Sequence, residues 1–239
     1  MDIVETLPSD RSQPVQPQDR RSLILQKAAE LFAIKGVSAT TVREIADVAG
    51  VLSGTLYHYF GSKDDMVAAI VIRYLEDLNA CYGAIAADID PAEQFVRLVE
   101  GSLSIIESHP YAMEIYQNSG KYLHSLASYD KIRQAVGCVQ RRWFDLLEAG
   151  VAAGVFRSDV PPRVLHRLVR DALWLSVRWF TPTEDYTTRQ LAANFVSVFL
   201  QGIRRDGAAA GTRVLPVGDA VLLPSVRRPP RRTSPRFRP

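Results

Sequence analysis

The stretch IADVAGVLSGTLYHYFGSKDDM, residues 45–66, places two very short helical segments on either side of a glycine turn. The small side chains of Ala46 and Ala49 allow two helices to approach closely. Gly50 tolerates the left-handed backbone that such a tight turn requires, and Leu56 is expected to fill the apolar centre. Three short helices with a glycine turn between the second and third are typical of a helix-turn-helix, whose last helix enters the DNA major groove.

The third short segment, residues 53–60, carries hydroxyl groups and aromatic rings that suit a major groove. Tyrosine and threonine hydroxyls can bond phosphates or base edges, and a small helix start lets the backbone approach DNA. A helix-capping threonine and a nearby lysine can anchor phosphates. The predicted DNA-contacting residues are Thr41, Ser53, Gly54, Thr55, Tyr57, His58, Tyr59 and Lys63. The alternative is that Tyr57 or Tyr59 is core; we expect Phe60 to be buried and Tyr57 exposed.

Helical signals continue along the rest of the chain. Apolar residues recur every three or four positions, capping residues open the segments, and glycine or proline closes them. The sequence has no sustained alternation of apolar and polar residues bounded by hairpin turns. We therefore predict an all-α fold, a three-helix unit followed by a larger helical bundle. The helices predicted for the bundle span residues 62–87, 90–108, 111–126, 128–152, 161–180 and 187–205.

Changes in composition mark the expected domain boundaries. Residues 1–19, rich in Pro, Gln and Ser, are predicted to form a disordered arm, followed by a DNA-binding domain over 20–66 and a larger domain over 67–206. Residues 207–239 are predicted to be a disordered Arg/Pro-rich tail. This tail holds seven arginines and one acid, Asp219, in a chain of net charge +3. It either binds a polyanion or is a solubilising extension.

Composition also narrows the class of protein. The 239 residues suffice for one large domain or two small ones. Cys81 and Cys138 cannot form a disulfide framework, which favours a reducing cytosol. No uncharged apolar run reaches membrane-spanning length, and the acidic, proline-containing start is not a signal peptide. We expect a cytoplasmic protein without a membrane partner.

Enzyme signatures are missing from the sequence. The four histidines are scattered, with no HExxH motif and no Cys/His spacing that suits a metal. There is also no G-x-S-x-G elbow and no glycine-rich phosphate loop. We predict no catalytic residue, no metal ligand and no cofactor.

A basic and aromatic stripe runs along the predicted helix 161–180. Its members follow one another at spacings of 4, 3, 4 and 4: Arg163, Arg167, Arg170, Trp174 and Arg178. Like charges so placed repel unless an anion compensates, and Asp171 relieves only part of this repulsion. The stripe is either a solvated basic face or a site where Arg170 and Arg178 hold phosphates or a carboxylate and Trp174 stacks on a ring. A coenzyme A thioester fits the second interpretation.

An acyl group would also need an apolar cavity. Helical apolar residues that either line such a cavity or form ordinary core are Ile105, Ile106, Met113, Tyr116, Phe144 and Leu147. Polar contacts inside it are predicted from Tyr116 and Gln117.

The predicted helix 187–205 is apolar around most of its circumference. Such a helix is buried on two sides, most economically by its own core and by a second subunit. A two-fold symmetric interface of four helices follows, in which a glycine permits a close crossing. The predicted interface residues are Trp179, Phe195, Phe199 and Gly202.

The segment TTVREIADVAGVLSGTLYHYFGSKDDMV, residues 40–67, resembles the DNA-binding signature of the TetR (tetracycline-repressor) family of bacterial transcription regulators. The resemblance covers residues 23–69. One departure is Leu52, where members commonly have a serine that caps the reading helix, and Ser53 is expected to take over part of that role. The resemblance implies a homodimer bound to double-stranded operator DNA, with a C-terminal domain that binds a small ligand and dimerises through its last two helices. Ligand binding then moves the fourth helix and releases the DNA.

Two further segments, EIYQNSGKYL at 114–123 and LVRDALWLSVRWF at 168–180, are similar to the TetR-family repressors of steroid-ring degradation. Those proteins sense a coenzyme A thioester of a ring fragment, and the similarity assigns ligand binding to Arg170, Trp174 and Arg178. A regulator of fatty-acid or aromatic acyl-CoA metabolism is the nearest alternative. A helical adaptor that does not bind DNA and an acyl-CoA-binding enzyme are alternatives of other classes.

Overall fold

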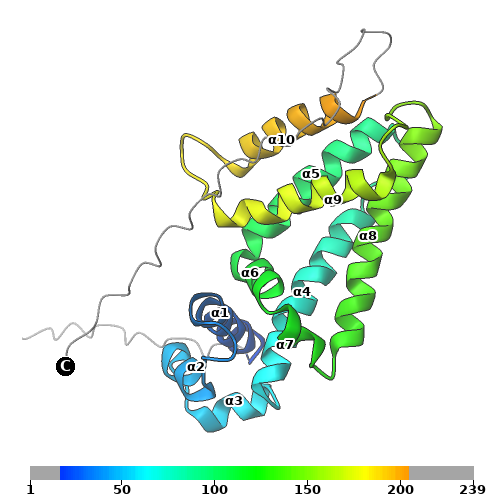
Figure 1. Ribbon diagram of the computed structural model, residues 1–239. Helices are drawn as coiled ribbons and strands as arrows, with labels where there is room; N and C mark the ends of the chain where they lie inside the picture. The colour runs from blue at the N-terminus through cyan, green and yellow to red at the C-terminus, as the bar shows by residue number, and fades with distance from the viewer. Residues whose placement is uncertain (1–16, 205–239) are drawn as a thin grey trace, which may run out of the picture. The chain divides into compact units, whose positions relative to one another are not determined.

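The computed structural model describes residues 17–204, and every regular element in that range is helical (Figure 1). The predicted tail and residues 1–16 of the predicted arm lie outside the described residues. Residues 17–19 of that arm belong to α1, so the prediction of disorder was wrong for these three residues. The helices are α1 (Pro17–Lys35), α2 (Val42–Ala49), α3 (Ser53–Tyr59), α4 (Lys63–Gly83), α5 (Pro91–Ser108), α6 (Pro110–Asn118), α7 (Gly120–His124), α8 (Tyr129–Ala152), α9 (Pro162–Leu175), the 3₁₀ helix η1 (Ser176–Arg178) and α10 (Thr188–Ile203). Within residues 17–204, no helix is both long and apolar enough to span a membrane. The predicted all-α fold is confirmed.

Helices α1 to α3 form the head of the molecule, and local sequence explains where each one ends. Gly36 and Gly50 follow α1 and α2 with φ of 85° and 64°, in the left-handed region that glycine enters without strain. Thr41 caps α2 in a capping box with Glu44. Helix α3 begins after Leu52 without any side-chain cap. The expectation that Ser53 caps α3 was therefore wrong, because Ser53 is already the first helical residue.

Helix α4 runs from the head into the bundle (Figure 1). It starts at the cap Ser62, whose side chain accepts from the backbone of Asp65, and its first turn is acidic, which suits the positive end of a helix. In the bundle, α4 packs against α5 and α8, and α10 packs against α5. The predicted helix 111–126 was wrong, because the chain breaks at Ser119 into α6 and α7.

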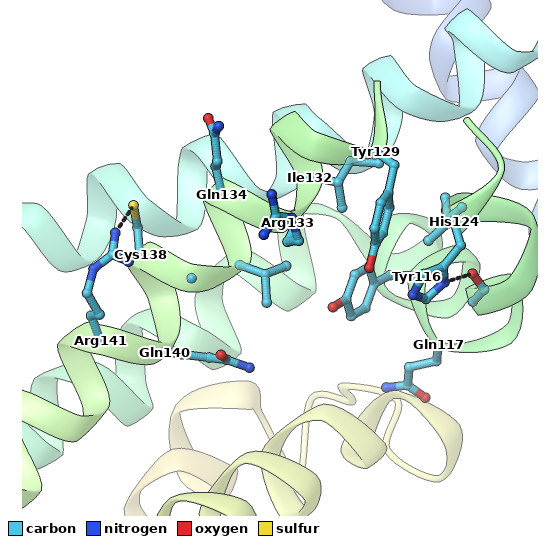
Figure 2. A pocket seen from close by; sticks show the side chains of 14 residues that line it. Tyr116, Gln117, His124, Tyr129, Ile132, Arg133, Gln134, Cys138, Gln140 and Arg141 are labelled. Carbon is cyan, nitrogen blue, oxygen red and sulfur yellow. Dashed lines mark hydrogen bonds between the residues drawn. The ribbon is translucent and has the colours of Figure 1, made fainter. Parts of the chain in front are cut away.

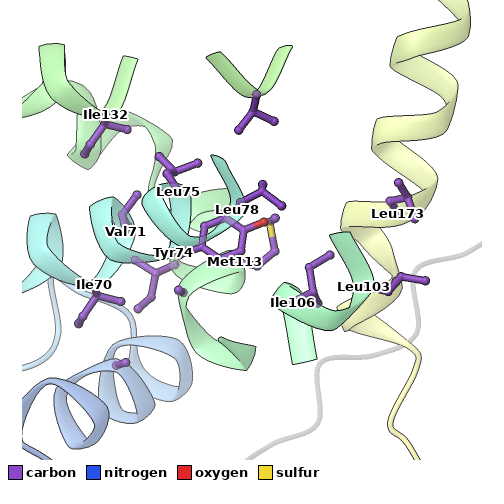
Figure 3. Close-up of a cluster of buried hydrophobic side chains, with 14 of the residues drawn as sticks. Ile70, Val71, Tyr74, Leu75, Leu78, Leu103, Ile106, Met113, Ile132 and Leu173 are labelled. Carbon is purple, nitrogen blue, oxygen red and sulfur yellow. The ribbon is translucent and has the colours of Figure 1, made fainter. Parts of the chain in front are cut away.

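The apolar face of α4 forms the centre of the core (Figure 3). Val71, Tyr74 and Leu78 have no exposed surface, and Met113 of α6 and Leu173 of α9 are buried with them. Ile106, Met113 and Leu147, which were candidates for lining an acyl cavity, are likewise buried in this core. The ordinary-core interpretation holds for these three residues.

A second part of the core consists of aromatic rings from α4, α5 and α8. The Trp143 ring packs edge-on against Tyr82 and Phe95, and its Nε1 donates to the Tyr82 hydroxyl at 3.1 Å. That hydroxyl also lies 2.6 Å from the Ser102 hydroxyl, so the buried polar groups satisfy one another. Phe156 closes the cluster against Phe95.

Candidate DNA-binding and ligand sites

Helix α3 presents one face to the core of the head and the other to solvent. Leu56 and, just after the helix, Phe60 are buried, whereas Tyr57 is 57% exposed. Tyr59 is half-buried and packs against the core. The expectations for Phe60 and Tyr57 are confirmed, and Tyr59 is the tyrosine that turns partly inward. Ser53, Gly54 and His58 are exposed and Thr55 is half-buried, so the face predicted to read DNA is open.

Thr41 and Lys63 both have structural partners in the head. The Thr41 hydroxyl donates to the Glu44 carboxylate at 2.9 Å and accepts from the Glu44 backbone at 3.2 Å. The Lys63 ammonium donates to the carbonyls of Val37 and Thr40 at 2.8 and 2.9 Å, which fixes the turn between α1 and α2. An ammonium has three N–H groups, so one remains for a phosphate.

The carboxylate of Glu44 is a common acceptor for polar groups around this turn. Its carboxylate accepts hydrogen bonds from Lys35 and from the Thr41 backbone at 2.8 Å. The Lys35 bond, followed by the two Thr41 bonds, lowers the pKa of Glu44 to about 2. Glu44 therefore remains ionised and keeps the start of α2 capped at any physiological pH.

The five residues predicted to bind a ligand lie together around Trp174. The Tyr116 ring packs edge-on against the Trp174 ring with centroids 5.7 Å apart, and the Arg170 guanidinium lies 5.6 Å from the same ring. Gln117 Nε2 donates to the Trp174 carbonyl at 2.5 Å, and Arg178 Nε donates to Gln117 Oε1 at 3.2 Å. Residues from α6, α9 and η1 thus form one polar and aromatic cluster.

The basic stripe differs from its prediction in two ways. The helix predicted over 161–180 was too long, because α9 ends at Leu175, and Arg178 lies in η1 with its Nη2 3.1 Å from the Asn118 side-chain oxygen. Asp171 also compensates more of the positive charge of the stripe than the sequence predicted, because it contacts two of its arginines. It accepts two bonds from Arg170, at 2.7 and 2.9 Å, and lies 3.7 Å from Arg167.

A cleft of about 950 Å³ opens beside this cluster, lined by α6, α7 and α8 (Figure 2). Tyr116 and Gln117 form one end of its lining. Arg133 and Arg141 of α8 contribute cationic groups, and apolar surface comes from Leu123, Ile132 and Val136. The α8 arginines were not predicted as site residues, because exposed polar residues on a helix have the pattern of an ordinary solvated face.

His166 of α9 is buried with its ring centroid 4.6 Å from that of Phe144. Burial, and secondly the positive charge of Arg170, lowers the pKa of His166 to about 4, although Asp171 acts in the opposite direction. The imidazole is therefore neutral at physiological pH.

This low pKa makes stability depend on pH. Between about pH 6.5 and pH 4 the unfolded chain binds a proton at His166 more readily than the folded chain does. The contribution of the neutral imidazole to the stability of the folded state is therefore complete above about pH 6.5 and is lost as the pH falls toward 4. We expect the thermal midpoint of wild type to fall between pH 7 and pH 4.5, and to fall less in His166→Gln. The exposed His58→Gln serves as control. Identical slopes for wild type and His166→Gln, measured by circular dichroism, would refute this assignment.

The residues predicted for a dimer interface lie directly after η1 and on α10. Trp179 is 67% exposed, and the stacked rings of Phe195 and Phe199, 4.2 Å apart, are half-buried. Gly202 is exposed, and a β-carbon there would meet nothing within 4 Å in this subunit. Further exposed apolar residues nearby in the sequence are Val164, Leu168, Leu175 and Val198.

A helix-turn-helix head with an open reading face, joined by one long helix to a bundle that holds a cleft, defines a DNA-binding regulator with a ligand-accessible domain. The chain belongs to the tetR family of bacterial regulatory proteins. Residues 24–70 match that family, and residues 88–203 match the tetracyclin repressor-like C-terminal domain. Membership in this family makes the chain a transcriptional regulator and not an enzyme.

Individual relatives are similar along most of the chain. The transcriptional repressor KstR2 of Mycolicibacterium smegmatis is 38% identical over 194 residues, which cover 81% of this chain and 95% of the relative. KstR2 of Rhodococcus jostii is 39% identical over 185 residues, covering 77% and 91%. The structure of the ketosteroid transcriptional regulator KstR2 of Mycobacterium tuberculosis superposes with a TM-score of 0.74 at 36% identity, covering 81% of this chain and 98% of that one.

Proposed function

We propose that the chain is a homodimeric transcriptional repressor whose operator binding is released by a coenzyme A thioester from steroid-ring catabolism. The observation that carries this proposal is the cluster of Arg170, Trp174 and Arg178 with Tyr116 and Gln117 beside the cleft. Guanidinium groups suit phosphates and carboxylates, and an indole stacks on a ring. The similarity to KstR2 of Mycobacterium tuberculosis, which is named a ketosteroid transcriptional regulator, favours a steroid-derived acyl group.

The dimer is supported by exposed apolar residues on α9, directly after η1 and on α10. Single exposed apolar residues are ordinary, but Leu168, Trp179 and Val198 are each more than half exposed within one stretch of the chain, residues 168–198. A two-fold interface between copies buries the same surface on both subunits. Two reading heads then contact one duplex, with cytoplasmic operator DNA as the partner.

The structure also offers a route from the cleft to the head. Helix α7 lines the cleft through Leu123 and His124, and the hydroxyl of its Tyr122 donates to the Asp64 carboxylate in the first turn of α4. The next residue back, Lys63, holds the turn between α1 and α2. A ligand that binds better when α7 is in another position therefore shifts the equilibrium of α7, and with it of the head, toward that position. The size of this shift is set by the difference between the ligand's affinities for the two positions.

The test compares wild type with Arg170→Ala and Trp174→Ala, using a fluorescent operator duplex recovered from a random library. We expect both variants to bind this duplex within about twofold of wild type. Release by a steroid-ring CoA thioester should need at least about tenfold more ligand, because a desolvated cation–π and ring-stacking contact is lost. Arg163→Ala, an exposed arginine of the same helix, should respond as wild type does.

The outcomes separate the parts of the proposal. If Arg170→Ala and Trp174→Ala release normally, the ligand site is wrongly assigned. If long-chain or aromatic acyl-CoA releases the duplex and the steroid-ring thioester does not, the site stands and the acyl group is wrong. If no CoA thioester has any effect, the effector class is wrong.

A further inference from the structure

Leu52 is a large apolar side chain placed in solvent where the head is expected to meet DNA. It is 81% exposed, the highest exposed fraction among the large apolar residues whose side chains the structure describes. It stands at the N-cap of α3, immediately before the exposed Ser53 and Gly54. Val48, on the other side of the Gly50 turn, is also exposed.

The position makes this exposure unusual. Scattered exposed leucines are common on protein surfaces, but an N-cap favours Ser, Thr, Asp or Asn, because their side chains accept a backbone hydrogen bond. Leu52 makes no such bond, so α3 begins without a side-chain cap. Stability therefore does not explain leucine at this position, and neither does packing within the described part of the head.

The backbone holds this side chain in a defined place. Leu52 is extended, with φ of −74° and ψ of 145°, and its carbonyl accepts from the backbone of Thr55 at 2.9 Å and of Leu56 at 3.4 Å. On the preceding side, the Val51 backbone donates to the Ala46 carbonyl at 3.0 Å. With both flanks bonded, Leu52 is presented at a fixed position relative to α3.

We propose that Leu52 is a specificity-determining residue that packs against the C5 methyl group of a thymine in each operator half-site. The thymine methyl is the apolar group that the major groove exposes, and apolar side chains recognise it. Burying it against Leu52 also removes an exposed leucine from water. This inference rests on the proposed operator binding by α3.

The test is a cycle between protein and DNA variants. A duplex is first selected from a random library by the full-length protein, and its thymines are then replaced one at a time by deoxyuridine, which lacks only the C5 methyl group. We expect wild type to lose about fourfold in affinity for one methyl removed in one half-site, and about fifteenfold when both half-sites are changed. Leu52→Ala is expected to bind the thymine duplex and the corresponding uracil duplexes with equal affinity.

Two further variants guard against trivial explanations. Leu52→Ser supplies a capping side chain and is expected to fold at least as well as wild type, yet to lose the discrimination. Ile34→Ala removes another highly exposed apolar side chain, from α1. This variant is expected to keep the wild-type preference for thymine over uracil.

The inference is overturned if wild type binds every uracil duplex as well as its thymine parent. It is also overturned if Leu52→Ala retains the wild-type preference, because the methyl is then read by another side chain. Failure to select any duplex would remove the proposed operator binding together with this inference, whereas selection without coupling at Leu52 removes the inference alone.

Discussion

Replacing Tyr57 by glutamate is expected to weaken operator binding on the order of 100-fold at physiological salt. Tyr57 is mostly exposed on α3 and lies one helical turn after Ser53, on the face that the proposal turns toward DNA. A carboxylate there faces phosphates instead of offering them a hydroxyl donor, and like charges brought together at an interface cost several kcal/mol. Each dimer carries the change twice.

The measurement is fluorescence anisotropy of the selected duplex at fixed salt, because affinities of this kind depend strongly on ionic strength. Ala149→Glu, at an exposed position of α8, adds the same charge away from the head and should bind within about twofold of wild type. Unchanged binding by Tyr57→Glu, with an intact circular dichroism spectrum, would mean that α3 does not enter the groove in this orientation.

Replacing Gly150 by alanine is expected to lower the free energy of unfolding by about 2 kcal/mol. A β-carbon at Gly150 would lie 2.1 and 2.3 Å from two carbons of the Phe156 ring. That ring cannot withdraw easily, because it is buried against Phe95 and the Phe156 backbone donates to the Gly150 carbonyl at 3.0 Å. The better helix propensity of alanine offsets only part of this overpacking.

Gly137→Ala is the matched control for this prediction. Gly137 lies in the same helix, α8, and its β-carbon would meet only the tip of the Arg141 side chain, at 3.4 Å. This variant should be as stable as wild type or up to about 1 kcal/mol more stable in urea unfolding. Equal stabilities of the two variants would show that the contact between Gly150 and Phe156 is not tight in solution.

The head could be predicted from sequence because its signals are local. Gly36, Gly50, Thr41 and Ser62 each act within a few residues, through a left-handed turn or a cap. These features need no knowledge of the rest of the fold. The cap of α3 was wrong, because Leu52 occupies the N-cap and leaves Ser53 inside the helix. The start of α1 was also wrong, because the helix begins at Pro17, inside the predicted disordered arm.

The end of α9 could not be predicted, because a distant residue is involved. Helical periodicity continues through residues 170–180, and in an α-helix the Trp174 carbonyl would accept from the backbone of Arg178. In the structure, Gln117 donates to that carbonyl, and the chain tightens into η1 after Leu175. Gly150 also acts through a residue outside its helix: α8 continues past it to Ala152, and the missing β-carbon makes room for Phe156.

Only part of the ligand cluster could be predicted from the sequence. Arg170 and Trp174 share a helix and could be paired by spacing, but their contact with Tyr116 and Gln117 depends on how α6 packs against α9 and η1. Nothing in local sequence distinguishes Arg133 from a solvated arginine, and only the packing of α6 to α8 places it on the cleft.

The most direct test of the central claim is the composition of the complex with DNA. Native mass spectrometry of the full-length chain with its selected duplex should give two chains per duplex. Addition of the effective CoA thioester should return free duplex and a free protein dimer. A complex with one chain per duplex, or a protein that remains monomeric and binds no duplex, would contradict the account.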